Sequence, residues 1–145
     1  MVFKDKVLFV DYEGVLSEKP VGSNFDKTVN LNDLLFDDVF RNCKPIKKMQ
    51  EFLRECVPNN IFVIGVIDTN YEIESKHYWL NQYYHFIIKE NIIFISSEHK
   101  KVDVINAFVK NKKLKKESII FIDDKESHLK HAREQQYICL NVNEI

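Results

Sequence analysis

The chain has 145 residues, the usual size of one domain. Its composition, 45% hydrophobic and 30% charged with only 3 Gly and 3 Pro, excludes a disordered, collagenous or low-complexity protein. A net charge of -1 excludes the global positive field that would hold nucleic acid or an anionic membrane through counterion release. The three cysteines are odd in number and scattered among apolar neighbours, so we expect reduced thiols in the core.

The first apolar run, at residues 7–10, is cut off by Asp11. It is far shorter than a signal-peptide core or the roughly 20 residues that span a bilayer. We therefore expect a cytoplasmic protein with no membrane partner.

Five short apolar runs rich in Ile, Val and Phe recur along the chain and predict β-strands. They do not alternate with polar residues, which is typical of strands buried on both faces of a parallel sheet. The runs lie at residues 7–10, 61–67, 92–95, 118–122 and 137–140.

Apolar residues at helical spacing fill the stretches between these runs. One helix is predicted after Pro45, a residue that suits the first helical turn, and another after Asp124. Two more are predicted over residues 72–84 and from Val102 to Val109. Strands that alternate with helices indicate right-handed crossovers, and so a parallel sheet with helices on both faces.

Residues 17–42 break this alternation. They hold a turn signal at Gly22-Ser23-Asn24 and then a short apolar patch before the regular pattern resumes. The segment is predicted to be a small insertion in a single domain that spans residues 1–145, because no repeat or linker-like segment marks a second domain.

Polar side chains follow three of the predicted strands where each strand ends. Asp11 and Glu13 follow the first, residues 68–70 follow the second, and Asp123-Asp124 follow the fourth. In open α/β sheets the ligand site lies outside the carboxyl ends of the strands. Carboxylates gathered there repel one another unless a positive group intervenes, and Mg²⁺, which prefers oxygen ligands, is the simplest such group.

The same residues resemble the signatures of a known family. Residues 11–16, Asp-Tyr-Glu-Gly-Val-Leu, resemble D-x-D-G-[TV]-[LI], the first motif of the haloacid dehalogenase (HAD)-like superfamily of aspartate-nucleophile phosphatases. Thr69 resembles the Ser or Thr that ends the second strand, Lys100-Lys101 the third-motif lysine, and residues 121–124 the acidic fourth motif. The resemblance covers nearly the whole chain. It implies a three-layer Rossmann-like α/β domain with strand order 5-4-1-2-3, and a minimal cap or loop at residues 17–42.

The resemblance also implies a Mg²⁺-dependent phosphomonoester hydrolase that acts through an aspartyl-phosphate. Asp11 would be the nucleophile and Glu13 the general acid and base. The Mg²⁺ ion would lie between Asp11, the backbone carbonyl of Glu13, and Asp124, with Asp123 supporting that shell.

The phosphate would be bound by Thr69, Asn70 and a lysine that supplies fixed positive charge. Lys101 is preferred to Lys100 because it directly precedes the apolar helical pattern. The substrate is expected to be a small phosphate ester, with a nucleotide as one candidate. Nucleic acid is not expected, because the lysines at residues 100–116 look like a solvated helix end and loop. The sequence does not decide between a monomer and an oligomer.

Two residues depart from the family pattern. Glu13 stands where the family has Asp, and its longer reach matters because a misplacement of about 1 Å can cost on the order of a hundredfold in rate. His128 stands four residues after Asp124, where the family more often has Asp or Asn. We interpret His128 and His131, three residues apart on a predicted helix, as surface residues.

These departures keep alternative functions open. A HAD-like binding or regulatory protein with weak or no catalysis would explain Glu13. A small nuclease is a second alternative. A receiver-type phosphoacceptor domain is disfavoured, because it places its acidic pair on the first strand, whereas this chain places it on the fourth.

Overall fold

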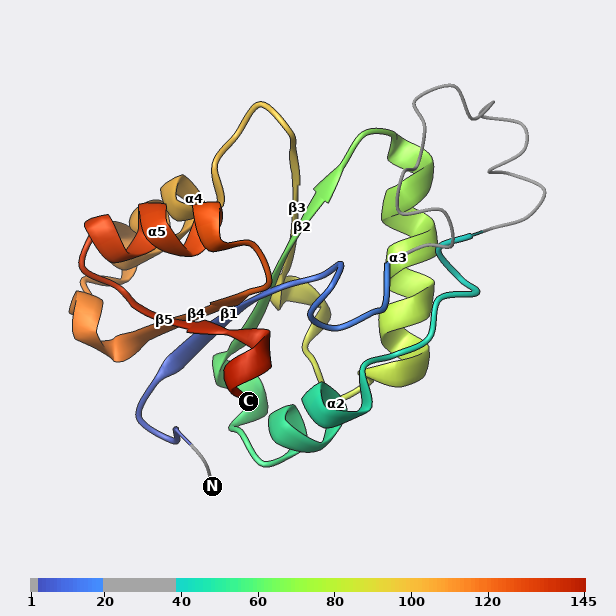
Figure 1. Ribbon diagram of the computed structural model, residues 1–145, viewed down its shortest axis with the longest axis horizontal. Helices are drawn as coiled ribbons and strands as arrows, with labels where there is room; N and C mark the ends of the chain where they lie inside the picture. Colours follow the sequence, from blue (N-terminus) through green and yellow to red (C-terminus); the bar gives the residue numbers. More distant parts are fainter. Residues whose placement is uncertain (1–2, 20–38) are drawn as a thin grey trace.

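A computed structural model describes residues 3–19 and 39–145 of the chain. Its parallel sheet has the strand order β3-β2-β1-β4-β5 (Figure 1). The predicted α/β fold class and strand order are confirmed. The strands are β1 (Val7–Asp11), β2 (Ile61–Ile67), β3 (Ile92–Ser96), β4 (Ile119–Asp123) and β5 (Ile138–Asn141).

Helices cover both faces of the sheet, so the fold has three layers. Figure 1 shows α2 and α3 on one side of the strands, and α4 and α5 on the other. Each helix lies within a few residues of its predicted position. The helices are α2 (Lys47–Arg54), α3 (Asn70–Tyr83), α4 (Lys101–Lys112) and α5 (Glu126–Glu134).

Two apolar clusters hold the layers together, one on each face of β1. Val10 packs in the cluster that includes Trp79 of α3, while Phe9 packs in the cluster that includes Ile105 of α4. All four side chains are fully buried. Burial of each large apolar side chain stabilises the fold by roughly 1.5–3 kcal/mol. Because both faces of β1 are covered, its sequence shows no polar alternation.

The direction of the chain across the sheet reverses between β1 and β4. The chain passes from β1 outward to β2 and β3, and then returns to β4 on the other side of β1. Val10 pairs with Ile122, so the next residues, Asp11 and Asp123, end their strands at the same edge of the sheet. This is the switch point at which open α/β sheets bind ligands.

All three cysteines are free; Cys56 is buried, whereas Cys43 and Cys139 are half-buried and not in the core as expected. Burial raises the pKa of Cys43, Cys56 and Cys139 to about 11 in each case. At neutral pH they are therefore protonated thiols and poor nucleophiles.

The predicted insertion at residues 17–42 lies mostly outside the described residues and stays a prediction. Within residues 3–19 and 39–145, no helix is long and apolar enough to cross a membrane.

Candidate active site

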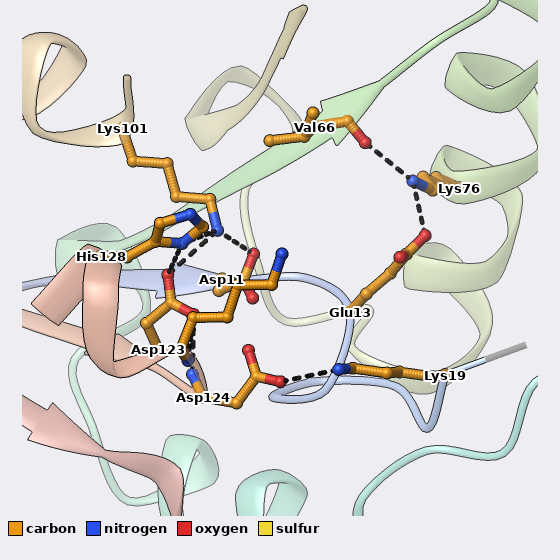
Figure 2. A network of polar contacts seen from close by, with 10 residues as sticks. Asp11, Glu13, Lys19, Val66, Lys76, Lys101, Asp123, Asp124 and His128 are labelled. Atoms are coloured by element: carbon orange, nitrogen blue, oxygen red, sulfur yellow. Dashed lines mark hydrogen bonds and ion pairs between the residues drawn. The ribbon is translucent and has the colours of Figure 1, made fainter. Parts of the chain in front are cut away.

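A buried lysine joins two carboxylates from neighbouring strands. Lys101, the first residue of α4, donates a hydrogen bond to Asp11 Oδ1 at 2.6 Å and to Asp123 Oδ2 at 3.0 Å (Figure 2). All three side chains are buried. Hydrogen bonds between charged groups are about twice as strong as neutral ones, and three separate elements are fixed together by this contact.

Burial and the neighbouring charges shift the pKa values of Asp11 and Lys101. Burial raises the pKa of Asp11 well above its usual value, and the nearby carboxylates add to this, although Lys101 opposes it. Burial also acts against the charge of Lys101, but Asp11 and Asp123 more than compensate and raise the pKa of the lysine. Asp11 is therefore a carboxylate whose charge is incompletely compensated by the protein itself.

Asp123 has a different role, because hydrogen bonds occupy both of its oxygens. Its Oδ1 accepts from the backbone N–H of Asp124 at 2.7 Å and of Lys125 at 3.1 Å. Its Oδ2 lies 3.0 Å from Nδ1 of His128. Although burial works in the opposite direction, these bonds and the charge of Lys101 hold the pKa of Asp123 below its usual range. Asp123 is thus an ionised anchor that orients its neighbours.

Three carboxylates converge closely enough to share one metal ion. Asp11, Asp123 and Asp124 each offer an oxygen, and these oxygens all lie within 4.8 Å of one another. We call these residues the acidic triplet. Asp124 also faces Lys19, whose Nζ lies 3.4 Å from Oδ2. Hard carboxylate oxygens are the ligands that Mg²⁺ prefers, and the raised pKa of Asp11 indicates charge that a cation would compensate, so the donor set fits Mg²⁺.

Gly14 allows Asp124 to approach the loop that follows β1. It has a positive φ of 81°, and a Cβ added there would overlap the Asp124 carboxylate. Only glycine adopts this conformation without strain and leaves this space free.

Gly14→Ala should therefore lower the free energy of unfolding by roughly 1–3 kcal/mol and weaken Mg²⁺ binding, because the new methyl group displaces Asp124. Chemical denaturation and calorimetric titration with Mg²⁺ measure the two effects. Gly65→Ala is the matched control, since its added Cβ would meet Phe94 instead. Gly65→Ala should lower the free energy of unfolding without changing Mg²⁺ binding. Unchanged Mg²⁺ binding in Gly14→Ala would contradict this account of the loop.

Glu13 lies beside the acidic triplet and points away from it, toward α3 (Figure 2). Its Oε1 is 3.1 Å from Nζ of Lys76, and its side chain is 39% exposed. The backbone of the same residue bridges to Ser17, which closes the loop that carries Gly14.

Thr69 and Asn70 do not line the cavity beside Asp11. Asp11 pairs in register with Ile64, and β2 continues to Ile67 before the chain turns. Thr69 therefore lies beyond the strand, where its N–H donates to the Glu72 side chain at 2.8 Å at the start of α3. The residue of β2 that lines the cavity is Val66, which has no hydroxyl group.

The two adjacent lysines differ sharply. Lys101 is the one that contacts Asp11, whereas Lys100 is exposed at the rim of the cavity.

His128 is not the simple surface residue that we expected. Its side chain is one-third exposed, and Nδ1 lies 3.4 Å from Nζ of Lys101 as well as close to Asp123. Helical spacing places His128 on α5, but it does not reveal that the first turn of α5 faces Asp123. His131 is exposed, as expected, and lies at the cavity rim.

The cavity at this edge of the sheet has a volume of about 630 Å³. Four lysines, Lys19, Lys100, Lys101 and Lys125, and three carboxylates, Asp11, Glu13 and Asp124, line it together with three histidines. Lys100 and Lys125 are exposed at the rim, where their charges would attract an anionic ligand.

No protein-family model and no curated protein matches the sequence. Solved structures do match the fold. A haloacid dehalogenase-like hydrolase from Streptococcus pneumoniae matches with a TM-score of 0.60 and 16% identity, over 97% of this chain and 85% of that one. A HAD family enzyme from Bacteroides thetaiotaomicron, solved as a magnesium complex, matches with a TM-score of 0.58 and 13% identity, over 94% and 92%.

A third match is to the N-terminal part of a Bacteroides fragilis protein that contains a phosphatase domain and was solved with Mg. It has a TM-score of 0.58 and 16% identity, and covers 97% of this chain and 36% of that one. At these identities the likeness establishes the fold, and the chain has the fold of HAD-like hydrolases.

Proposed function

We propose that the protein is a cytoplasmic Mg²⁺-dependent phosphomonoester hydrolase that forms an aspartyl-phosphate on Asp11. What supports this most is the contact of the buried Lys101 with Asp11 inside the acidic triplet. A carboxylate with a raised pKa, a fixed cation and converging oxygen ligands at the switch point of the sheet suit phosphoryl transfer. The Mg-containing HAD-fold structures give further support.

Asp11 and Asp124 would hold the metal ion, together with the backbone carbonyl of Glu13, while Asp123 orients this set. When bound, Mg²⁺ neutralises charge on the phosphoryl oxygens.

The protein residues supply the rest of the chemistry. One oxygen of Asp11 attacks phosphorus, the bond from phosphorus to the ester oxygen breaks, and the alcohol leaves with a proton from Glu13. Water then loses its proton to Glu13 and attacks the aspartyl-phosphate, which releases phosphate and restores Asp11. The ammonium of Lys101 lies beside the nucleophile throughout and stabilises negative charge that develops on the phosphoryl group.

The substrate is proposed to be a small phosphate ester, and nucleotides are one class to test. The basic rim of the cavity would attract such an anion. Three free cysteines fit a reducing compartment, which is the basis for the cytoplasmic location.

A panel of phosphomonoesters that includes nucleotides, sugar phosphates and p-nitrophenyl phosphate tests the proposal. Phosphate release is measured with Mg²⁺ and after treatment with EDTA. We expect release from at least one ester, its loss in EDTA and its recovery when Mg²⁺ is restored. An enzyme that releases phosphate equally well in EDTA would contradict the metal-dependent mechanism.

A HAD-like binding or regulatory protein is the second candidate. It is favoured by Glu13, which stands where the family has Asp and is one methylene longer. Mg²⁺ binding measured by calorimetry without phosphate release from any ester of the panel would favour this candidate over the hydrolase.

A further inference from the structure

Lys76 of α3 is a fully buried lysine that the proposed chemistry leaves without a role. Its Nζ lies 3.1 Å from Oε1 of Glu13 and 3.6 Å from Oε1 of Glu72 (Figure 2). It also donates a hydrogen bond to the backbone carbonyl of Val66 in β2 at 3.2 Å. The ammonium is therefore held between two carboxylates and a strand carbonyl.

A buried ammonium is costly unless it is paired, with a penalty of several kcal/mol. Glu72 and the carbonyl of Val66 already pair the Lys76 ammonium without any contribution from Glu13. Glu72 is fixed because its other oxygen, Oε2, accepts the backbone N–H groups of Asp68 and Thr69 at the start of α3. With Glu72 and Val66 O both set by regular secondary structure, the place of the ammonium is set as well.

Aromatic rings enclose the same ammonium. Nζ lies 5.2 Å from the ring centre of Tyr12 and 5.1 Å from that of Phe40. Rings at this distance attract a cation through their negative faces and keep water away from it. The Lys76 ammonium is thus a buried positive charge in contact with the Glu13 carboxylate. The Glu13 side chain itself is 39% exposed and lines the cavity.

We propose that Lys76 is a positioning residue that holds the Glu13 carboxylate at the cavity wall for proton transfer. This inference rests on the proposed phosphatase function. A free glutamate side chain samples many rotamers, and one charge-assisted bond to a fixed partner removes most of that freedom. Proton transfer in both steps depends on such placement, because the proton passes between Glu13 and one atom, the ester oxygen in the first step and the water oxygen in the second.

The pairing also explains why a glutamate suits this position. Asp at residue 13 would be one methylene shorter, about 1.5 Å, and would fall short of an ammonium that Glu13 reaches at 3.1 Å. Glu13→Asp, which moves the sequence toward the family pattern, should therefore lose the contact with Lys76. We expect it to impair the enzyme.

Kinetics with two leaving groups test the positioning role. The substrates are p-nitrophenyl phosphate, whose leaving group needs no proton, and the best alkyl phosphate of the panel, whose leaving group does. In Lys76→Met, kcat/KM for the alkyl ester should fall at least about tenfold more than for the p-nitrophenyl ester. Glu13→Gln and Glu13→Asp should show the same selective loss. Lys76→Met added to Glu13→Gln should cause little further loss.

Lys47→Met makes the same chemical change on the exposed face of α2 and should alter neither rate. Thermal unfolding of every variant separates folding defects from kinetic ones. If Lys76→Met does not fold, Glu13→Asp still tests the contact, because its position is partly exposed and the change should not prevent folding.

Equal losses on the two substrates, additive losses in the double variant, or a gain in Glu13→Asp or Lys76→Met would each overturn the role of Lys76. None of these outcomes would contradict the proposed phosphatase function. A wild-type protein that releases phosphate from no ester would overturn the proposed function, and the positioning role with it.

Discussion

Asp11→Asn should abolish phosphate release while the protein remains folded. The amide cannot form the aspartyl-phosphate, and loss of a nucleophile costs on the order of 10⁴-fold or more in kcat. The variant should be at least as stable as the wild type without metal, because burial disfavours the charge of Asp11 and Lys101 keeps its contact with Asp123. Steady-state phosphate release and chemical denaturation measure the two effects.

Asp103→Asn is the matched control, since Asp103 lies on the exposed surface of α4 and does not line the cavity. Its activity should equal that of the wild type. Substantial phosphate release by Asp11→Asn would show that water attacks the ester directly. A large loss of stability would contradict the expectation that Lys101 is held well enough by Asp123 alone.

Lys101→Met should harm both stability and catalysis. Without the ammonium, Asp11 and Asp123 face each other at the edge of the sheet with no buried cation between them. Breaking a buried ion pair in this way costs about 3–5 kcal/mol. Mg²⁺ should restore part of this stability, because an ion bound only by the folded state shifts the unfolding equilibrium. With Mg²⁺ present, kcat should still fall by about 10²–10³, as expected when a group that stabilises developing charge is removed.

The stability defect of Lys101→Met should grow as the pH rises. The pKa of Asp11 is raised in the folded protein, so the folded state binds this proton more tightly than the unfolded state does, and deprotonation lowers stability. Lys101 opposes that effect in the wild type. Denaturation curves at several pH values without metal measure the difference between the two proteins. A defect that shrinks with rising pH would contradict the assigned charges.

Lys100→Met is the natural comparison, because Lys100 precedes Lys101 directly but is exposed at the cavity rim. Its removal should leave stability unchanged and affect KM at most. Equal defects in the two variants would mean that the buried contact to Asp11 has no special role.

The sheet and the acidic residues were predictable from the sequence for a physical reason. Strands buried on both faces have to be apolar, so β1, β2 and β4 stand out as runs of Ile, Val and Phe. The polar residues that interrupt such runs lie at the strand ends, and the ends of parallel strands share one edge. Asp11 and Asp123 therefore come together as expected.

The contacts between helices and this edge were not predictable in the same way. Helical spacing places Lys76 on α3 and His128 on α5, but spacing does not tell which turn faces a carboxylate. A lysine within an aromatic helix was the available signal for Lys76. The apolar run at residues 61–67 predicts the end of β2 correctly, but it does not reveal that Asp11 pairs with Ile64, three residues before that end. The phosphate-binding role of Thr69 therefore stays a prediction.

The most direct test of the aspartyl-phosphate mechanism is mass spectrometry after acid quench of the enzyme during turnover with Mg²⁺ and its best substrate. We predict a phosphoryl group on the peptide that contains Asp11, absent from Asp11→Asn and absent when Mg²⁺ is removed by EDTA. Phosphate release under conditions that leave this peptide unmodified throughout a single turnover would contradict the mechanism.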